Sequence, residues 1–278
     1  MAIRDSRKIK AILSDPKSGL VDKVARSLVD YTVALFALKG SPQKLKLGGT
    51  GTLVAFGGNH FILTARHVWD ETLKTADLIG ITMKPGITHR TVLNRSAVTA
   101  IGLPPPGDWD EWGPDLVLLS MPKEDVGRIT AVKSFWTLDQ RVEINASVLE
   151  QNVLVGTPEE TGTITDIHAD LLMHGMFLAA EKLTKRDGLD YLDYDMNLGQ
   201  RVQLIGPSFP KNFGGVSGGG VWRVFLYWEP ARDEIDWKMS LHGVAFWQFP
   251  PAGERNVIRC HGPESIAATL RLLNSKSS

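Results

Sequence analysis

One serine of this sequence lies in a setting that regular secondary structure seldom uses. Ser217 is surrounded by five glycines in the segment GGVSGGG at residues 214–220. Glycine loses more backbone freedom on folding than any other residue, so such a run is kept where the chain turns sharply or approaches a ligand. A serine on such a turn, with free peptide N–H groups beside it, has the geometry of a nucleophile next to an oxyanion hole. The structural alternative is a glycine-rich hairpin loop with a solvated serine.

A histidine and an aspartate earlier in the chain have the chemistry to activate that serine. His67 closes the apolar segment FILTARH at residues 61–67, and Asp115 opens the apolar segment DLVLL at residues 115–119. A serine hydroxyl is a poor nucleophile near neutral pH and needs a neighbouring base, for which the imidazole pKa is suitable. Taken singly, each residue is more often structural. Their order of His, Asp and Ser, and their local settings, favour a shared site.

These segments resemble the chymotrypsin/trypsin-like serine proteases. The resemblance is carried by GTGTLV at residues 49–54, ILTARHV at residues 62–68, the strand opened by Asp115, and GVSGG at residues 215–219. It implies that His67 is the general base, that Asp115 orients His67, and that Ser217 is the nucleophile. It also implies an oxyanion hole formed by the N–H groups of Gly215 and Ser217.

The same resemblance implies where a substrate side chain would bind. The primary pocket is expected between the segment Phe246-Trp247-Gln248 and the residues just before Ser217, with Lys211 at its base. A lysine there repels basic side chains, so no preference for Arg or Lys at P1 is expected. Gln248 stands where a glycine often keeps the pocket open, which predicts a shallow pocket for acidic, polar or small residues.

Two alternative functions are weighed against a working protease. The segment GVSGG also fits the G-x-S-x-G elbow of α/β-hydrolases, but that elbow requires a helix after the serine. Residues 221–227, VWRVFLY, are β-branched and aromatic instead, as in a strand. The other alternative is a catalytically silent trypsin-like module that binds peptides or regulates a partner. The residue before Ser217 is Val216. Animal digestive enzymes of the family that this chain resembles have an acidic residue at that position, which pairs with the N-terminus formed when the zymogen is cleaved. Because valine cannot make that ion pair, zymogen activation of that kind is not expected.

The strand and turn signals predict the architecture. Short β-rich segments separated by turns, without βαβ alternation, favour an all-β protein, and the resemblance implies two antiparallel Greek-key β-barrels. We expect a basic N-terminal arm and helix at residues 1–29, with the helix starting at Asp15-Pro16 and residues 1–15 forming a loose arm or short helix. The first barrel is expected at residues 30–125. A connection, the second barrel and a C-terminal helix opened by Pro263 follow at residues 126–278, and residues 185–197, rich in aspartate, are expected to form a solvated acidic loop.

Composition bounds the partners and the compartment. The chain has 278 residues, 31 basic and 31 acidic, and 43% of them are hydrophobic, so neither nucleic acid nor membrane is predicted as a partner. The basic N-terminal region lacks interleaved aromatics for base stacking. Cys260 is the single cysteine, which excludes an intrachain disulfide and indicates a reducing compartment or a bacterial- or viral-type branch. We expect a cytoplasmic protein without cofactor or metal, acting on a protein or peptide substrate, with a regulatory protein as a further partner.

Overall fold

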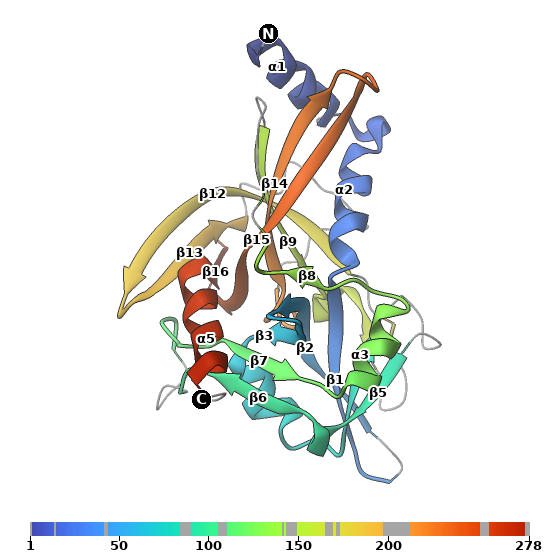
Figure 1. The fold of residues 1–278 in the computed structure, drawn as a ribbon, viewed down its shortest axis with the longest axis vertical. Coiled ribbons are helices and arrows are strands. Elements are labelled where there is room, and N and C mark those ends of the chain that lie inside the picture. Colours follow the sequence, from blue (N-terminus) through green and yellow to red (C-terminus); the bar gives the residue numbers. More distant parts are fainter. Residues whose placement is uncertain are drawn as a thin grey trace.

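The chain folds into two antiparallel β units with helices at both ends, as Figure 1 shows. This confirms the predicted all-β class with its N-terminal and C-terminal helices. The computed structural model describes residues 2–13, 15–41, 44–83, 90–104, 110–140, 142, 149–164, 169–170, 173–196, 212–250 and 256–275.

The first unit is a sheet with the strand order β5-β4-β1-β2-β3-β7-β6, to which β8 adds as a parallel neighbour of β2. Alternate residues of its strand β1 (Thr32–Lys39) enter two different cores: Val33 and Leu35 face the main cluster, whereas Ala34 and Phe36 pack against Leu47. The strand is therefore apolar on both faces. The strands are β1 (Thr32–Lys39), β2 (Lys44–Phe56), β3 (Asn59–Thr64), β4 (Leu78–Thr82), β5 (Arg90–Asn94), β6 (Thr99–Gly102), β7 (Val117–Ser120) and β8 (Trp136–Thr137).

The second unit is a closed barrel with the order β12-β13-β16-β15-β14-β9. Its strands are β9 (Leu149–Gly156), β12 (His174–Arg186), β13 (Leu189–Asp195), β14 (Gly220–Glu229), β15 (Glu234–Gln248) and β16 (Val257–His261). A separate two-stranded sheet joins β10 (Thr163–Ile164) to β11 (Ala169–Asp170).

The two units share one topology. In the first, the fourth strand lies beside the first in the order β4-β1-β2-β3, and in the second the order β14-β9-β12-β13 repeats it. This is the Greek-key arrangement. The last two strands also correspond, because β7 and β6 follow β3 as β16 and β15 follow β13. No repeat is visible in the amino-acid sequence, so the equivalence lies in the strand connections.

The N-terminal region is helical from near its start. Helix α1 (Ala2–Leu13) lies beside the β14–β15 hairpin, and α2 (Leu20–Val29) runs from it toward β1 (Figure 1). The expected helix start at Asp15 is wrong for α2. The Asp15 carboxylate accepts the Lys17 N–H at 2.9 Å and caps a separate 3-10 turn, η1 (Pro16–Ser18). Gly19, at φ 64°, ends that turn in the left-handed region, so α2 begins at Leu20.

An apolar face of α2 fastens this region to both β units. Leu20, Val24 and Leu28 recur at helical spacing and pack against Val153 and Trp222 of the barrel. The Trp222 ring also lies 5.4 Å from the ring of Trp136, on β8 of the first unit, and 5.3 Å from that of Tyr31. The α2 region therefore helps hold the two units together.

Residues between and after the two β units complete the fold. Helix α3 (Lys123–Thr130) precedes β8. Helix α5 (Pro263–Ser275) contacts β6 of the first unit together with β13 and β15 of the second. Shorter helical segments are η2 (Val68–Leu73), η4 (Arg95–Ala97) and η5 (Glu159–Thr161).

The predicted solvated acidic loop is wrong within the described part of residues 185–197. These residues form the end of β12, the turn at Asp187 and Gly188, and the whole of β13. Asp190 is buried and accepts the Ser265 N–H at 2.7 Å, at the start of α5. Asp193 pairs with Arg259 through two contacts of 2.6 and 2.8 Å. The carboxylates are retained inside the fold because each has a specific partner.

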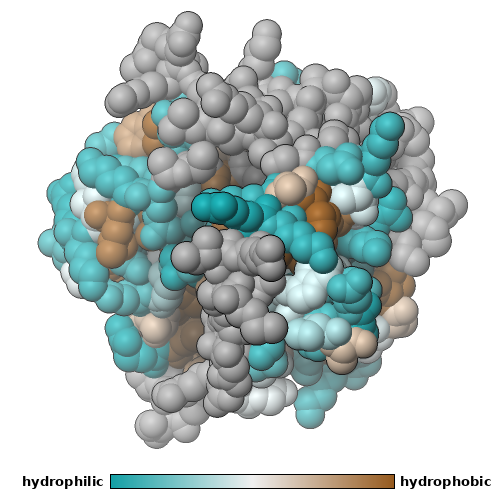
Figure 2. Space-filling model, turned by 90° about the horizontal axis from the view of Figure 1, so that it is seen from above, coloured by the Kyte–Doolittle hydropathy of each residue, from teal (hydrophilic) through white to brown (hydrophobic). Residues whose placement is uncertain are grey.

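The face of the molecule seen in Figure 2 is mainly polar where it is described. Seen from above, its described part is largely hydrophilic, with small separate apolar patches (Figure 2). Among the large hydrophobic side chains of the described residues, Leu183 is the one that is exposed. None of the helices in the described ranges is long and apolar enough to cross a lipid bilayer.

Candidate active site

His67 and Asp115 are brought together by the pairing of β3 with β7. The antiparallel register places Thr64 opposite Val117, so the residues just beyond these strand ends face each other. The Asp115 carboxylate receives two contacts from His67: the backbone N–H donates to Oδ1 at 2.8 Å, and the ring Nδ1 lies 2.5 Å from Oδ2. Contact through both carboxylate oxygens fixes the position and the ring orientation of His67, with Nε2 left for other contacts.

The environment of His67 raises its pKa above the usual value. Burial opposes the charged form, but the hydrogen bond to Asp115, its negative charge and that of Glu71 outweigh burial. The His67 side chain is 25% exposed, whereas that of Asp115 is 3% exposed. A partly accessible imidazole backed by a buried carboxylate is suited to accept a proton and to hold the resulting charge.

A second histidine, which the sequence analysis did not single out, supports Asp115 from behind. His261 is buried on β16, and its Nε2 accepts the Asp115 backbone N–H at 3.0 Å. Because Nε2 accepts, the ring proton is on Nδ1, which has no partner within the described part of the chain. Burial lowers the pKa of His261 to about 4, against the opposing charges of Asp115 and Asp190. His261 is therefore a neutral acceptor around neutral pH.

Aromatic rings hold His261 in place. The Phe246 ring stacks on it at 4.2 Å, and the Tyr191 ring lies 5.3 Å away. The Tyr191 hydroxyl donates to the carbonyl of Trp112, three residues before Asp115. This cluster joins strands of the second unit to the segment that carries Asp115 in the first.

The Ser217 segment is anchored to the same end of the first unit. The Ser217 carbonyl accepts the Thr50 N–H at 2.8 Å. A Cβ atom added at Gly49 would meet both that carbonyl, at 2.8 Å, and the side chain of Val68, at 2.7 Å. The Ser217 backbone and Val68, the residue that follows His67, therefore both pack closely against Gly49. The Ser217 hydroxyl makes no hydrogen bond to any described residue.

Three consecutive carbonyls of this segment are held by hydrogen bonds. The Gly214 carbonyl accepts the Glu159 N–H at 2.7 Å, and the Gly215 carbonyl accepts the Thr50 hydroxyl at 2.7 Å. The Val216 carbonyl accepts the Gly219 N–H at 2.7 Å.

Holding these carbonyls determines where the N–H groups point. In a trans peptide the N–H points opposite to the carbonyl, so the Gly215 N–H points away from Glu159. Within the described residues, the N–H groups of Gly215 and Ser217 have no acceptor, while the Val216 N–H between them donates to Phe213. Two unpaired N–H donors beside a serine can donate hydrogen bonds to an anionic oxygen.

The residues predicted to bind the substrate side chain have different environments. Lys211 lies outside the described residues. Phe246 is 2% exposed, with its ring against His261, and so lies in the core. Trp247 is half-buried, and its indole N–H has no partner within the described ranges. The Gln248 side-chain oxygen accepts the Phe213 N–H at 3.0 Å, which connects β15 to the segment before Ser217.

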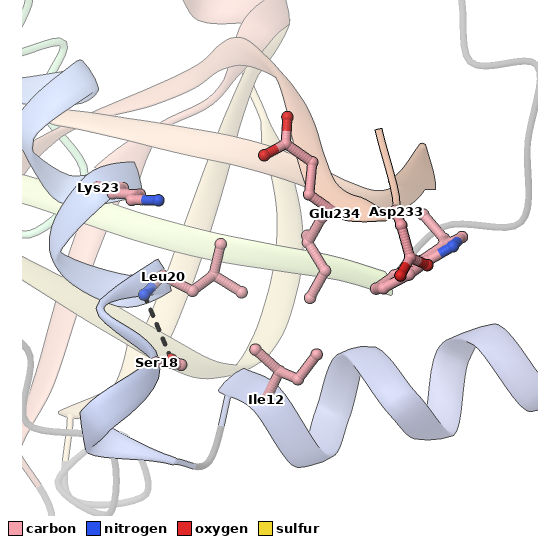
Figure 3. A pocket seen from close by; sticks show the side chains of 8 residues that line it. Ile12, Ser18, Leu20, Lys23, Asp233 and Glu234 are labelled. Atoms are coloured by element: carbon pink, nitrogen blue, oxygen red, sulfur yellow. Dashed lines mark hydrogen bonds between the residues drawn. The ribbon is translucent and has the colours of Figure 1, made fainter. Parts of the chain in front are cut away.

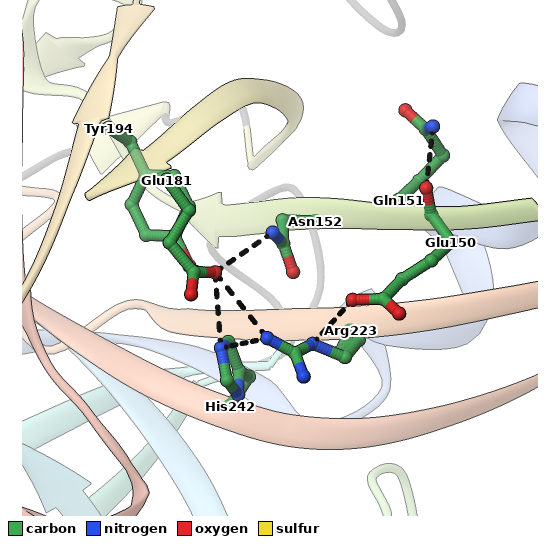
Figure 4. A network of polar contacts seen from close by, with 7 residues as sticks. All are labelled: Glu150, Gln151, Asn152, Glu181, Tyr194, Arg223 and His242. Carbon is green, nitrogen blue, oxygen red and sulfur yellow. Dashed lines mark hydrogen bonds and ion pairs between the residues drawn. The ribbon is translucent and has the colours of Figure 1, made fainter. Parts of the chain in front are cut away.

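The second unit also carries a network of polar side chains (Figure 4). The Glu181 carboxylate accepts the Tyr194 hydroxyl at 2.9 Å and the Asn152 amide at 3.2 Å. His242 Nε2 lies 2.5 Å from an Arg223 guanidinium nitrogen. Burial and the Arg223 charge lower the pKa of His242. The network ties together strands β9, β12, β13, β14 and β15 and thereby stabilises the barrel.

An open pocket of about 210 Å³ lies between the N-terminal helices and the β14–β15 hairpin (Figure 3). Neither His67, Asp115 nor Ser217 lines it. Its lining residues are Ile12, Ser18, Leu20, Lys23, Trp228, Asp233, Glu234 and Ile235.

Comparison with protein-family models and with curated proteins gives no match to this chain. The chemistry of the candidate site is therefore inferred from its own residues.

Proposed function

We propose that this protein is a serine endopeptidase of the chymotrypsin/trypsin-like kind. The observation that carries the proposal is the double contact of Asp115 with His67 beside a serine segment that has two unpaired N–H groups. A base, a group that orients it, a nucleophile and oxyanion donors are the set that acyl transfer requires.

His67, Asp115, Ser217 and Gly215 carry the steps of the proposed reaction between them. The Ser217 oxygen attacks the peptide carbonyl carbon while His67 Nε2 takes its proton, and Asp115 stabilises the imidazolium that forms. The N–H groups of Gly215 and Ser217 bind the oxygen that becomes negative. Collapse of the tetrahedral intermediate expels the amine, which receives the proton from His67 and leaves an acyl-enzyme. Water, deprotonated by His67, then releases the acid and restores Ser217.

We expect the enzyme to disfavour basic residues at P1. The positive charge of Lys211, at the expected pocket base, repels Arg and Lys, and the Gln248 side chain occupies the expected pocket wall. Small, polar or acidic P1 residues are favoured. Cleavage of a peptide library resolves the preference, and efficient cleavage after arginine contradicts it.

Covalent labelling with a fluorophosphonate tests the proposal without a known substrate. Wild-type protein should be modified at Ser217, Ser217→Ala should not react, and His67→Ala should react far more slowly. With a good peptide substrate, either change should lower kcat by something on the order of 10⁶.

The competing function is a silent module that binds peptides. In that case wild-type protein resists the probe and yet binds peptides, and Ser217→Ala binds them equally well. That result would exclude the endopeptidase.

A further inference from the structure

The segment that carries the oxyanion donors has little stiffness of its own. Gly214 and Gly215 have no side chains to restrict them, and Gly215 has a φ of 86°, which other residues rarely adopt. Rotation of the Gly214–Gly215 peptide would turn its carbonyl to where the Gly215 N–H now points, and rotation of the Gly215–Val216 peptide would reorient the donor peptides on both sides of it. The conformation must therefore be held by groups outside the segment.

Thr50 supplies one side chain that holds the Gly215 carbonyl in place. Its hydroxyl donates to the Gly215 carbonyl at 2.7 Å and accepts the Thr157 N–H at 3.0 Å. A hydroxyl has one hydrogen to donate, and an N–H cannot accept, so that hydrogen is committed to Gly215. Thr50 is fully buried, which keeps water from competing for these contacts.

The backbone of Thr50 makes two further hydrogen bonds. Its N–H donates to the Ser217 carbonyl at 2.8 Å, and its carbonyl accepts the Thr64 hydroxyl at 2.7 Å. Thr64 lies three residues before His67. Thr50, on β2, thus links Thr64 of β3, the Ser217 segment, and Thr157, which directly follows β9.

We propose that Thr50 is a positioning residue whose hydroxyl keeps the oxyanion donors oriented toward the substrate. This role rests on the proposed function, because it acts on the donors of that reaction. The Glu159 N–H on the Gly214 carbonyl fixes the peptide that carries the Gly215 N–H. The Gly215 carbonyl belongs to the next peptide, which lies between the two donor peptides, so the Thr50 hydroxyl fixes the orientation of one donor relative to the other. The hydrogen bonds of the Thr50 hydroxyl involve neither His67 nor Asp115.

The test compares Thr50→Val, which removes the hydroxyl at nearly constant shape, with Thr50→Ser, which keeps it. The readout is the second-order rate of fluorophosphonate labelling across pH. Thr50→Val should lower the plateau rate by about 10- to 100-fold, approaching the loss of one oxyanion donor, and Thr50→Ser should stay within about threefold of wild type. The midpoint of the pH profile should not move, since His67 and Asp115 keep their contacts. With a peptide substrate the loss should appear in kcat rather than in KM.

Thr52→Val is the matched control. Thr52 is equally buried on the same strand, and its hydroxyl donates to the Gly218 carbonyl at 3.1 Å, beyond the peptides that carry the two donors. Thr52→Val should lose about as much stability in thermal unfolding as Thr50→Val does. Its loss of labelling rate should be smaller than that of Thr50→Val. If Thr50→Val does not fold, Thr50→Cys, with a weaker donor, should label at an intermediate rate.

The outcomes separate this proposal from the function it rests on. If wild-type protein is not labelled, the endopeptidase itself is excluded and the positioning role falls with it. If wild-type protein is labelled, equal rates for Thr50→Val and wild type overturn the positioning role alone. Equal losses in Thr50→Ser and Thr50→Val, or in Thr50→Val and Thr52→Val, overturn it as well.

Discussion

The pH response of the candidate site depends on one residue, His67, and on its contact with Asp115. Only the neutral imidazole can accept the Ser217 proton, and the negative charge of Asp115 raises the His67 pKa above 6.5. The labelling rate should therefore fall as the pH drops, with a midpoint above pH 6.5. Asp115→Asn removes the charge, which should move the midpoint to lower pH and reduce the plateau by roughly 10⁴. Fluorophosphonate labelling between pH 5 and 9 measures both effects.

Asp236→Asn is the control for that experiment. Asp236 contacts Tyr227 and Arg232 in the β14–β15 hairpin, so its loss should leave the midpoint unchanged. A midpoint that stays in place for Asp115→Asn would contradict the assignment of Asp115 to His67.

At the scale of elements, the serine segment is packed so closely against β2 and β3 that one of its glycines admits no side chain. Gly218 has a φ of 90°, and an added Cβ would lie 2.0 Å from the Thr50 carbonyl oxygen and 2.1 Å from the Thr64 hydroxyl. Gly218→Ala should lower the free energy of unfolding by more than about 3 kcal/mol and abolish labelling. Chemical denaturation measures the first effect.

The β2–β3 turn contains the matched control. Gly58 also has a positive φ, of 76°, but no atom lies within 4 Å of an added Cβ. Gly58→Ala should lose only about 1–2 kcal/mol, from the left-handed backbone alone. Equal losses of unfolding free energy in Gly218→Ala and Gly58→Ala would show that the close packing at Gly218 does not contribute to stability.

Helix α2 contributes through its buried face. Leu28 is fully buried between the helix and the barrel, so Leu28→Ala should lower stability by about 2–5 kcal/mol. Arg26→Ala, on the exposed face, should change it by less than about 0.5 kcal/mol. Thermal unfolding of both variants measures the difference, and similar values would show that α2 does not hold the β units together.

For the whole molecule, the free energy of unfolding at acid pH depends on His261, which joins the second unit to Asp115 of the first. Its folded pKa of about 4 lies below the usual 6.5, so between these values the unfolded chain binds a proton that the folded chain does not. Stability should fall as the pH drops from 6.5 to 4, by up to roughly 3 kcal/mol from this group. His67 acts in the opposite direction, because its raised pKa favours folding at low pH and that contribution is lost as the pH rises through it.

Denaturant unfolding of His261→Gln and wild type across this pH range measures how much His261 contributes to the pH dependence of stability. The glutamine keeps a hydrogen-bond acceptor toward Asp115 but does not titrate, so its acid slope should be shallower. A variant with the wild-type slope would assign the acid sensitivity to other groups.

The sequence by itself determined the β class, the terminal helices and the residues proposed for catalysis. Strand periodicity is local information, and so is a glycine run around a serine. The roles of Thr50, Asp190 and His261 were decided by tertiary structure alone. A threonine in a strand is ordinary until its hydroxyl meets Gly215, 165 residues away. Asp190 suggested a solvated loop because the helix start that it caps lies 75 residues further on. His261 has no telling neighbours in the chain, and its acceptor role exists only because folding buries it against Asp115. Partners so distant in sequence leave no local pattern, since chain topology brings them together.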